Sequence, residues 1–353
     1  MPKPAGTRLT VGYVLAPAAA TLALGSATLV RANDSDDPVI VTASNDTTNQ
    51  LLVFGLNGAL LSAIATQGQG GVGGNAGGIS SAHGRVAVVN FGSNNVTVLE
   101  RTAGPAMFRI EKVIATHGSP VSVAFGEDHL YELTITQVES HAIGANGVAA
   151  TADGSTPLLH ADGSAAQVGV VRGELIMTEK SNAVESVKLD SGGAINGTAT
   201  MVAGMPANVD TPFGLATRGN EAYVTIAHAD EISLVRNNTV LATTPSVTQH
   251  APCWVTLDGP FLFSSNSPSK SISRYAVYGQ KIVQDAAVVA TLGGSPTDIA
   301  YRRGVADSNG TQSHVSIFNV DQDGNLAPRG VATLNSSKIN GMAIVSGRDA
   351  DRH

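Results

Sequence analysis

The sequence predicts an all-β protein folded as a seven-bladed β-propeller with four antiparallel strands in each blade. Three observations support this prediction. A segment made of an apolar strand, a polar turn and an alternating strand recurs about every 44 residues. Charged residues make up only 14% of the chain and glycine occurs 39 times, a composition typical of short strands joined by tight turns. No long amphipathic helix pattern interrupts the repeats.

The first 32 residues have the features of a secretory signal peptide rather than of a repeat. Lys3 and Arg8 precede 22 uncharged residues, and the small residues at Val30–Ala32 match the spacing of a signal-peptidase site. A membrane anchor is the alternative, because 22 apolar residues are long enough to span a bilayer. We expect cleavage after residue 32, a single propeller domain over residues 33–353, and a secreted or periplasmic location.

Removal of this segment would make the exported chain more acidic. It would take away the three positive charges of Lys3, Arg8 and Arg31 and change the net charge from −7 to −10. An acidic chain of this kind is a poor candidate for binding nucleic acid or an anionic membrane. The single cysteine, Cys253, cannot form a disulfide within the chain, so packing must stabilise the exported fold.

Each repeat contains a strand that ends at a polar residue, followed by a turn and another strand. These strand ends fall at or near Asn45, Asn90, Thr134, Glu179, His228, Asn266 and Asp307. Each unit opens with a small or proline-containing turn and a short apolar strand that ends in glycine, which supplies the backbone freedom of a hairpin turn. Alternation then indicates half-buried strands. We expect residues 339–345 to return to the first blade and close the ring, because an open sheet edge invites aggregation.

The strand ends predict a binding site on one rim of the central channel. In a propeller, the turns after the second strands and the linkers to the next blades share that rim. The linkers bring further polar residues to it, among them Asp210 and His250. Concave sites with a few convergent polar groups commonly bind small ligands, so a small molecule is the expected partner.

Glu179 and Lys180 are an adjacent acid and base at one of these strand ends. Successive strand residues point to opposite faces, so only one of the two can easily face the channel. The alternative interpretation is a solvated ion pair that contributes under about 1 kcal/mol to stability. His228 occupies the equivalent position in the next repeat, where a histidine could serve as a general base or only form a hydrogen bond.

Five further residues are candidates for substrate binding: Asn90, Asp210, Asn266, His141 and Arg274. An asparagine at a strand end can instead bond its own backbone and shape the turn. His141 lies in the repeat that departs most from the others. Arg274 is of the residue type that binds a carboxylated substrate, although an arginine within a strand also pairs with neighbouring blades.

Two short motifs lack the sequence context that their functions need. The spaced glycines of GQGGVG, residues 68–73, are followed by a strand and not by the helix of a dinucleotide site, so we interpret the segment as a flexible loop. The DQDGN sequence, residues 321–325, begins like a calcium loop but has no glutamate at the required later position. No Cys/His spacing of a metal site occurs, and we expect neither a metal nor another cofactor.

The repeats resemble those of the lactonase-type seven-bladed propellers, also called YVTN-repeat proteins. The resemblance rests on segments such as VAVVNFGSNNVTVLE, TPFGLA and APCWVTLDG, and it covers about residues 38–345. The YVTN signature itself is present only as variants such as AVVN and LFSSN. The wider group includes 6-phosphogluconolactonase and a fungal carboxymuconate-lactonizing enzyme.

The resemblance implies a lactone hydrolase or a lactonizing isomerase that acts at the channel rim by general acid/base catalysis without a metal. On this hypothesis Glu179 or His228 is the general base, and His250, Lys180 or Arg274 stabilises negative charge. We do not expect 6-phosphogluconate as the substrate, because its pathway is cytosolic and no basic phosphate-binding cluster is visible. The alternative is a non-catalytic propeller that binds a small molecule, a glycan or an exported protein through the same rim.

Overall fold

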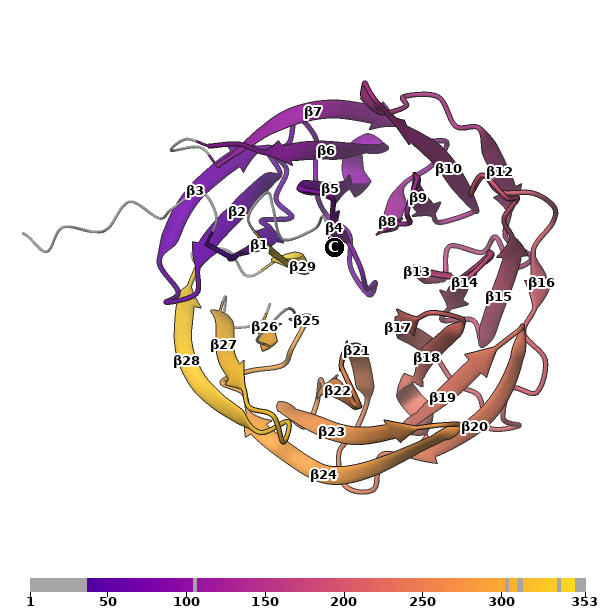
Figure 1. Ribbon diagram of the computed structural model, residues 1–353, viewed down its shortest axis with the longest axis vertical. Coiled ribbons are helices and arrows are strands. Elements are labelled where there is room, and N and C mark those ends of the chain that lie inside the picture. The colour runs from indigo at the N-terminus through magenta and orange to yellow at the C-terminus, as the bar shows by residue number, and fades with distance from the viewer. Residues whose placement is uncertain (1–36, 104–106, 302–304, 310–313, 335–337, 347–353) are drawn as a thin grey trace, which may run out of the picture. The chain divides into compact units, whose positions relative to one another are not determined.

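The structure is a computed structural model that describes residues 37–346, except 104–106, 302–304, 310–313 and 335–337. The expected signal peptide, residues 1–32, lies outside the described residues. Within the described part of the chain, seven separate antiparallel sheets follow one another around a ring (Figure 1). No helix in this part is both long and apolar enough to cross a membrane.

Each sheet is one blade, and its strands lie in the following order from the channel outward. Blade 1 contains β29 (Asn340–Val345), β1 (Val39–Ala43), β2 (Gln50–Gly55) and β3 (Leu60–Ala65). Blade 2 contains β4 (Ile79–Ala82), β5 (Arg85–Asn90), β6 (Asn95–Arg101) and β7 (Phe108–Ala115), with the 3-10 turn η1 (Phe91–Ser93) after β5. Blade 3 contains β8 (Pro120–Phe125), β9 (His129–Thr134) and β10 (Gln137–Gly144), with β11 (Gly147–Val148) and β12 (Gly154–Pro157) both paired to β10.

The remaining blades follow the same order. Blade 4 contains β13 (Ala165–Val171), β14 (Glu174–Glu179), β15 (Ala183–Lys188) and β16 (Thr200–Met201). Blade 5 contains β17 (Pro212–Arg218), β18 (Glu221–Ile226), β19 (Glu231–Arg236) and β20 (Thr239–Pro245), with the 3-10 turn η2 (Ala227–Ala229) after β18. Blade 6 contains β21 (Pro252–Asp258), β22 (Phe261–Asn266), β23 (Ser271–Tyr278) and β24 (Lys281–Thr291). Blade 7 contains β25 (Asp298–Tyr301), β26 (Val305–Asn309), β27 (His314–Val320) and β28 (Leu326–Thr333).

The seven sheets confirm the predicted propeller. The innermost strand of every blade contacts the innermost strands of both neighbours, from β4 around the ring to β29 and back to β4. Six blades have the predicted four strands. Blade 3, the divergent repeat, has a fifth strand because β10 pairs with β11 near one end and with β12 near the other.

Burial differs from strand to strand within a blade. The second strands, such as β1, β9, β14 and β18, are buried along their whole length. They are covered on both sides because each blade packs face to face between two others. The expected alternation of buried and exposed residues therefore belongs to the outer strands, such as β24 in blade 6, rather than to the second strands.

The last described strand closes the ring as predicted. β29 pairs antiparallel with β1 from Val39 opposite Val345 to Thr42 opposite Met342. Arg101, at the end of β6, is 1% exposed and holds this junction. Its guanidinium donates to the backbone carbonyl of Val345 at 2.8 Å and to the carbonyl of Asp37. One buried side chain of blade 2 thus holds both ends of the described chain.

Arg101→Met should destabilise the fold strongly, because it removes the charged donor from two backbone carbonyls at the closure. We expect the free energy of unfolding to fall by about 2–4 kcal/mol, as measured by urea denaturation. Arg109→Met is the matched control, because Arg109 is exposed and pairs with Glu100 at the surface. That variant should change stability by less than about 1 kcal/mol. Equal losses in the two variants would contradict the assigned role of Arg101.

Candidate functional site

The channel opens on the predicted rim into a cavity of about 400 Å³, which we call the mouth cavity. Its walls come from the turn after β1, the linkers that precede β4, β25 and β29, and the first residues of β17 and β21. The lining residues are Asn45, Gly71, Val72, Gly73, Gly74, Asn75, Phe213, Trp254, Thr297, Lys338, Ile339 and Asn340. Phe213 and Trp254 pack edge to face with ring centroids 5.4 Å apart and form an apolar wall.

Residues 66–78, which we call the channel loop, run from β3 into the middle of the ring before β4 begins (Figure 1). The side-chain oxygen of Asn45 accepts hydrogen bonds from the amides of Gly71 and Val72 at 2.6 and 3.1 Å. Asn75 and Asn340 exchange two side-chain hydrogen bonds, at 2.7 and 3.2 Å. These contacts join the loop to blade 1 on both sides of its tip.

The channel loop also contacts blades on the far side of the ring. The indole nitrogen of Trp254 donates to the carbonyl of Asn75 at 3.2 Å, and the amide of Ala76 donates to the carbonyl of Ala166 at 3.1 Å. The segment that was expected to be a flexible loop is packed and hydrogen-bonded in the structure. The glycines serve close packing: a Cβ added at Gly78 would lie 2.2 Å from Oδ1 of Asn340.

Lys180 faces this channel loop, and Glu179 does not. The ammonium group of Lys180 donates to the carbonyl of Gly74 at 2.5 Å, and burial lowers its pKa. Lys338 also lines the mouth cavity, together with Asn45, Asn75 and Asn340, whose side-chain amides bond within the protein. None of its twelve lining residues is an acid or a histidine.

Glu179 points between blades 3 and 4. It is fully buried, neither carboxylate oxygen has a hydrogen-bond partner among the described residues, and burial raises its pKa to about 9. Its carboxylate lies near the carboxylate of Glu185 and the ring of His160. The spacing of these three side chains would allow them to share a cation. However, Glu185 already accepts hydrogen bonds from the amides of Leu159 and His160, and His160 is exposed.

Two histidine–aspartate pairs lie on the same rim as the mouth cavity. His228, in η2, places Nδ1 2.9 Å from the hydroxyl of Thr211 and 3.3 Å from a carboxylate oxygen of Asp210. His250 places Nδ1 2.8 Å from a carboxylate oxygen of Asp230. Both side chains are exposed. An aspartate at Nδ1 orients an imidazole so that Nε2 is available as a base, which is the arrangement used in catalytic triads.

His228 is connected to the mouth cavity through a short segment. Thr211, its hydroxyl partner, is two residues from Phe213 in the cavity wall. The amide of Thr211 donates to the side chain of Asn182 at 3.0 Å, in the turn that also carries Lys180. The structure thus brings Lys180, Asp210 and His228 to one side of the mouth, with His250 in the adjoining linker.

Asn90 and Asn266 complete strand-end networks and do not line the cavity. The amide group of Asn90 donates to Asn95 and Thr97 at 2.7 and 2.9 Å, and its oxygen accepts from Asn49 and Thr66. Asn266 donates to the equivalent residues Ser271 and Ser273 in blade 6. Both asparagines bond side chains of the next strand, and neither bonds its own backbone as the alternative interpretation proposed.

Arg274 and His141 lie away from the mouth. Arg274, in β23, bonds Asp285 and the backbone carbonyl of Asp323, and its guanidinium lies 5.0 Å from the ring centroid of Phe261. His141, in β10, is buried beside Glu132 and Glu139. Burial raises the pKa of Glu132 to about 10.

Several residues of the mouth were not identified from the sequence. Lys338 and Asn340 carry no distinguishing local motif, while Phe213 and Trp254 lie in repeat segments that gave no indication of a ligand site. Trp254 does pack in a core cluster, but one edge of it also forms the cavity wall. The one available signal was the unusual density of glycine over residues 68–78, which indicates close approach of a backbone.

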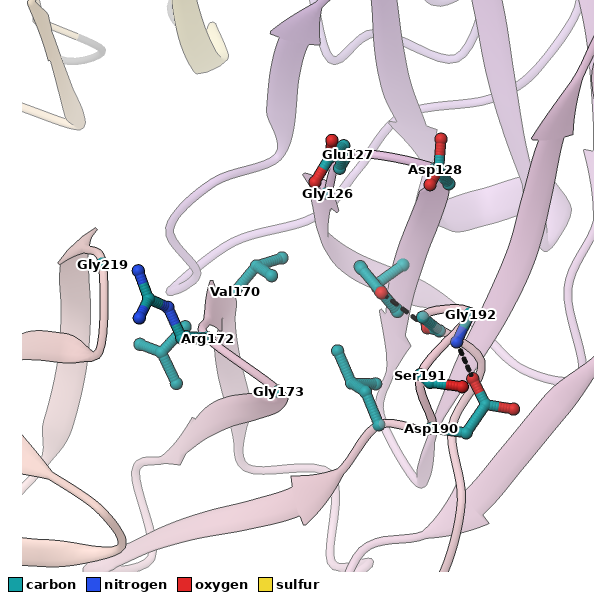
Figure 2. A pocket seen from close by; sticks show the side chains of 14 residues that line it. Gly126, Glu127, Asp128, Val170, Arg172, Gly173, Asp190, Ser191, Gly192 and Gly219 are labelled. Carbon is teal, nitrogen blue, oxygen red and sulfur yellow. Dashed lines mark hydrogen bonds between the residues drawn. The ribbon is translucent and has the colours of Figure 1, made fainter.

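A second cavity, of about 530 Å³, opens on the opposite rim between blades 3 and 4 (Figure 2). Its charged residues, Glu127, Asp128, Arg172 and Asp190, are exposed and surround the opening without converging on one point. Asp190 bonds the amide of Gly192 in its own turn at 2.8 Å. We therefore regard the smaller mouth cavity, which has an apolar wall and convergent donors, as the candidate site.

Comparison with known proteins identifies the fold of the chain and does not identify its function. No protein-family model and no curated protein matches the chain. Three solved structures cover 88% of it: a protein of unknown function from Desulfotomaculum acetoxidans (14% identity, 99% of that chain, TM-score 0.66), a Bacteroides fragilis protein provisionally assigned as a 6-phosphogluconolactonase (12%, 99%, 0.65), and the periplasmic gluconolactonase of Pseudomonas aeruginosa (14%, 100%, 0.63). The chain therefore has the fold of the lactonase-type propellers, as its repeats implied.

Gly78→Ala tests whether the channel loop needs its close packing. The added methyl group would push Asn340 away from Asn75, and we expect a loss of about 1–3 kcal/mol in the free energy of unfolding. Gly73→Ala is the control, because a Cβ there meets no atom within 4 Å, and it should change stability by less than about 0.5 kcal/mol. Urea denaturation measures both. An unaffected Gly78→Ala protein would show that the loop is not held as described.

Glu179→Gln tests the buried carboxyl. The folded state keeps this group protonated up to a pKa of about 9, whereas the unfolded chain releases the proton near 4.5. The wild-type protein should therefore lose stability as the pH rises between these values, because its folded state binds more protons. The variant should lose less, so that its advantage over wild type grows from pH 5 to pH 8 in denaturation midpoints. Glu127→Gln, at an exposed site, is the control. An advantage of the same size at both pH values would be evidence against a neutral Glu179.

Proposed function

We propose that this propeller is an exported enzyme that hydrolyses a small cyclic ester, or a related carboxylated lactone, at the mouth cavity. One observation carries the proposal. The His228–Asp210 pair lies on the same rim as the mouth cavity, which Lys338 lines and beside which the ammonium group of Lys180 bonds the channel loop. Ester hydrolysis requires a base and a group that stabilises negative charge, and a substrate that fills the cavity and reaches the rim would meet both.

The reaction would begin with a water molecule beside Nε2 of His228. The imidazole takes a proton from this water, and the resulting hydroxide attacks the ring carbonyl carbon. Negative charge develops on the carbonyl oxygen, where Lys338 and Lys180 stabilise it. The ring C–O bond then breaks, and the departing alkoxide takes the proton from the imidazolium to give an open-chain hydroxy acid.

The lining of the cavity favours a ligand of modest size that carries a negative charge or several hydroxyl groups. Lys338 and the side chains of Asn45, Asn75 and Asn340 are polar, while Phe213 and Trp254 can cover the apolar face of a ring. A phosphorylated sugar usually requires several convergent cations. The single lysine among the lining residues therefore favours an unphosphorylated lactone.

Binding without turnover is the second candidate function. It is favoured by the absence of any acid or histidine from the described residues that line the mouth cavity. The amide side chains of Asn45, Asn75 and Asn340 are also engaged in the channel loop, which makes the cavity rigid. A rigid cavity with cations and an aromatic wall is suited to capture of a carboxylate or sugar acid.

Hydrolysis of a panel of lactones by the mature chain, residues 33–353, tests the enzymatic proposal. The release of acid is measured by pH-stat. His228→Gln should lower kcat/KM by about 10²–10⁴-fold, the contribution of a general base. His83→Gln is the matched control, because His83 is an exposed histidine in the turn between β4 and β5 on the opposite rim. Circular dichroism verifies that each variant is folded.

The same panel separates the two candidate functions. Lys338→Met should weaken binding of a lactone or its hydroxy-acid product by about 10-fold or more, because it removes a charged donor. Turnover lost in His228→Gln supports the enzyme. Calorimetric binding that depends on Lys338, without turnover of any ring size, supports the binding protein. Turnover that survives in His228→Gln would refute the proposed base.

A further inference from the structure

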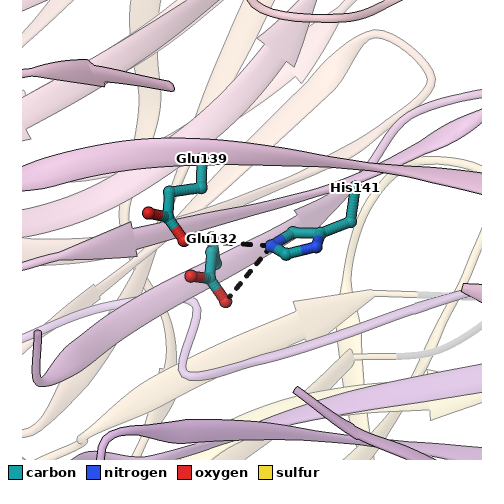
Figure 3. A group of neighbouring side chains, drawn as sticks. All are labelled: Glu132, Glu139 and His141. Carbon is teal, nitrogen blue, oxygen red and sulfur yellow. Dashed lines mark ion pairs between the residues drawn. The ribbon is translucent and has the colours of Figure 1, made fainter. Parts of the chain in front are cut away.

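A second cluster of polar side chains is buried in blade 3, away from the mouth cavity. Glu132 in β9 lies directly opposite Glu139 in β10, and His141 follows two residues later on the same face. The three residues are at most 1% exposed. Figure 3 shows the imidazole of His141 directed at both carboxylates.

The atoms that meet in this cluster have no hydrogen-bond partners within the described part of the chain. Both oxygens of Glu132, Oε2 of Glu139 and Nε2 of His141 are unpartnered. Nε2 of His141 lies 3.8 Å from Oε2 of Glu132 and 4.0 Å from Oε2 of Glu139, too far for hydrogen bonds. Buried polar atoms that have no partner are rare and costly, and a bound cation or a proton shared between Glu132 and Glu139 would satisfy the carboxylates.

The remaining polar atoms of His141 and Glu139 already have hydrogen-bond partners. Nδ1 of His141 lies 3.1 Å from the carbonyl of Ala149, so Nδ1 carries the proton and Nε2 presents a lone pair to the carboxylates. Oε1 of Glu139 accepts from the side chain of Gln137 and lies 2.5 Å from Nδ1 of His117. Outer partners of this kind orient the ligands of metal ions in proteins.

We propose that Glu132, Glu139 and His141 bind one divalent transition-metal ion, with Zn²⁺ preferred, as a structural brace between β9 and β10. One imidazole nitrogen and two carboxylates form a donor set that suits zinc. Each of the three residues offers a ligand atom, and these atoms lie within 4.8 Å of one another. Ligand atoms of tetrahedral zinc are roughly 3.4 Å apart, so binding would draw the three groups inward by a few tenths of an ångström.

Charge and position support the same proposal. Among the described residues, no lysine or arginine forms an ion pair with Glu132 or Glu139, and their basic neighbours are the two histidines His117 and His141. A dication would neutralise the two buried carboxylates. His117 is largely exposed and contacts Glu139 directly, so the cluster lies close to solvent and an ion could enter there. No local motif indicates the cluster, because its ligands are contributed by two strands.

The second acidic cluster, at Glu179, provides an internal comparison. Its histidine, His160, is exposed, and the oxygens of Glu185 are already occupied by backbone amides at 3.0 Å. It therefore lacks the set of free, oriented donors that blade 3 offers. Glu179→Gln changes a buried glutamate in the adjacent blade and is the matched control for Glu132→Gln.

The test uses the mature chain without a histidine tag, stripped with a chelator and titrated with ZnCl₂ against a chromophoric competitor at neutral pH. Wild type and Glu179→Gln should bind about one zinc ion per chain, and Glu132→Gln should bind substoichiometrically. Added zinc should raise the melting temperature of the wild type and leave that of Glu132→Gln unchanged.

A readout on the wild-type protein alone covers the case in which Glu132→Gln does not fold. Cobalt(II) added to the metal-free protein should give the visible absorption spectrum of a protein-bound ion. Addition of zinc should abolish this spectrum, because zinc occupies the same site. If the wild type takes up neither metal, the proposal is overturned, and the two carboxyl groups share a proton instead. Full zinc binding by a folded Glu132→Gln protein would overturn it as well.

Discussion

Pairing of β29 with β1 is the constraint on which the rest of this structure depends. A propeller whose first and last strands do not meet would expose a sheet edge and leave one blade without a neighbour on one face. In this chain a strand from the end of the described residues becomes the innermost strand of the first blade. The seven innermost strands then form a continuous ring, and the linkers that enter them form the walls of the mouth cavity.

A repeated polar position within the blades links this architecture to both acidic clusters. The third residue of the third strand is Thr97, Glu139, Glu185, Ser233 and Ser273 in blades 2 to 6. In blades 2, 3 and 4 this side chain bonds the linker that arrives from the preceding blade, so it connects neighbours around the ring. In blades 5 and 6 it bonds the fourth strand of its own blade.

The same position explains why blades 3 and 4 are chemically different from the others. Asn90 with Thr97, and Asn266 with Ser273, are neutral pairs that satisfy each other at 2.9 and 2.8 Å. Blade 4 places Glu179 and Glu185 at these two positions, and blade 3 adds Glu132 across from Glu139. Two buried carboxyl groups cannot both be ionised without a counter-charge. A proton in blade 4 and a metal ion in blade 3 are two ways to meet that requirement.

The mouth cavity and the two acidic clusters lie in different parts of the molecule and differ in their chemistry. The channel loop is hydrogen-bonded to blades 1, 3, 4 and 6, while the histidine–aspartate pairs lie at the exposed rim. Preorganised donors beside accessible bases favour chemistry on a small ligand. The solved structures that share this fold are only 12–14% identical to it, so the function must be argued from these groups and not from the fold.

The number of blades, the approximate ends of the second strands and the closing strand could be predicted from the sequence, although β18 ends at Ile226, before His228, and β26 runs past Asp307 to Asn309. These features follow from local alternation, turn chemistry and a repeat length, all of which are encoded by residues close together in the chain. Three features depend on the folded ring: Lys180 faces the channel while Glu179 is buried, the glycine-rich segment is a packed loop, and Arg274 contacts the neighbouring blade. Each of these outcomes depends on partners distant in sequence, such as Gly74 for Lys180 and Asn340 for Asn75. Local sequence patterns do not identify such partners, because residues that are far apart in the chain come into contact only when the ring closes.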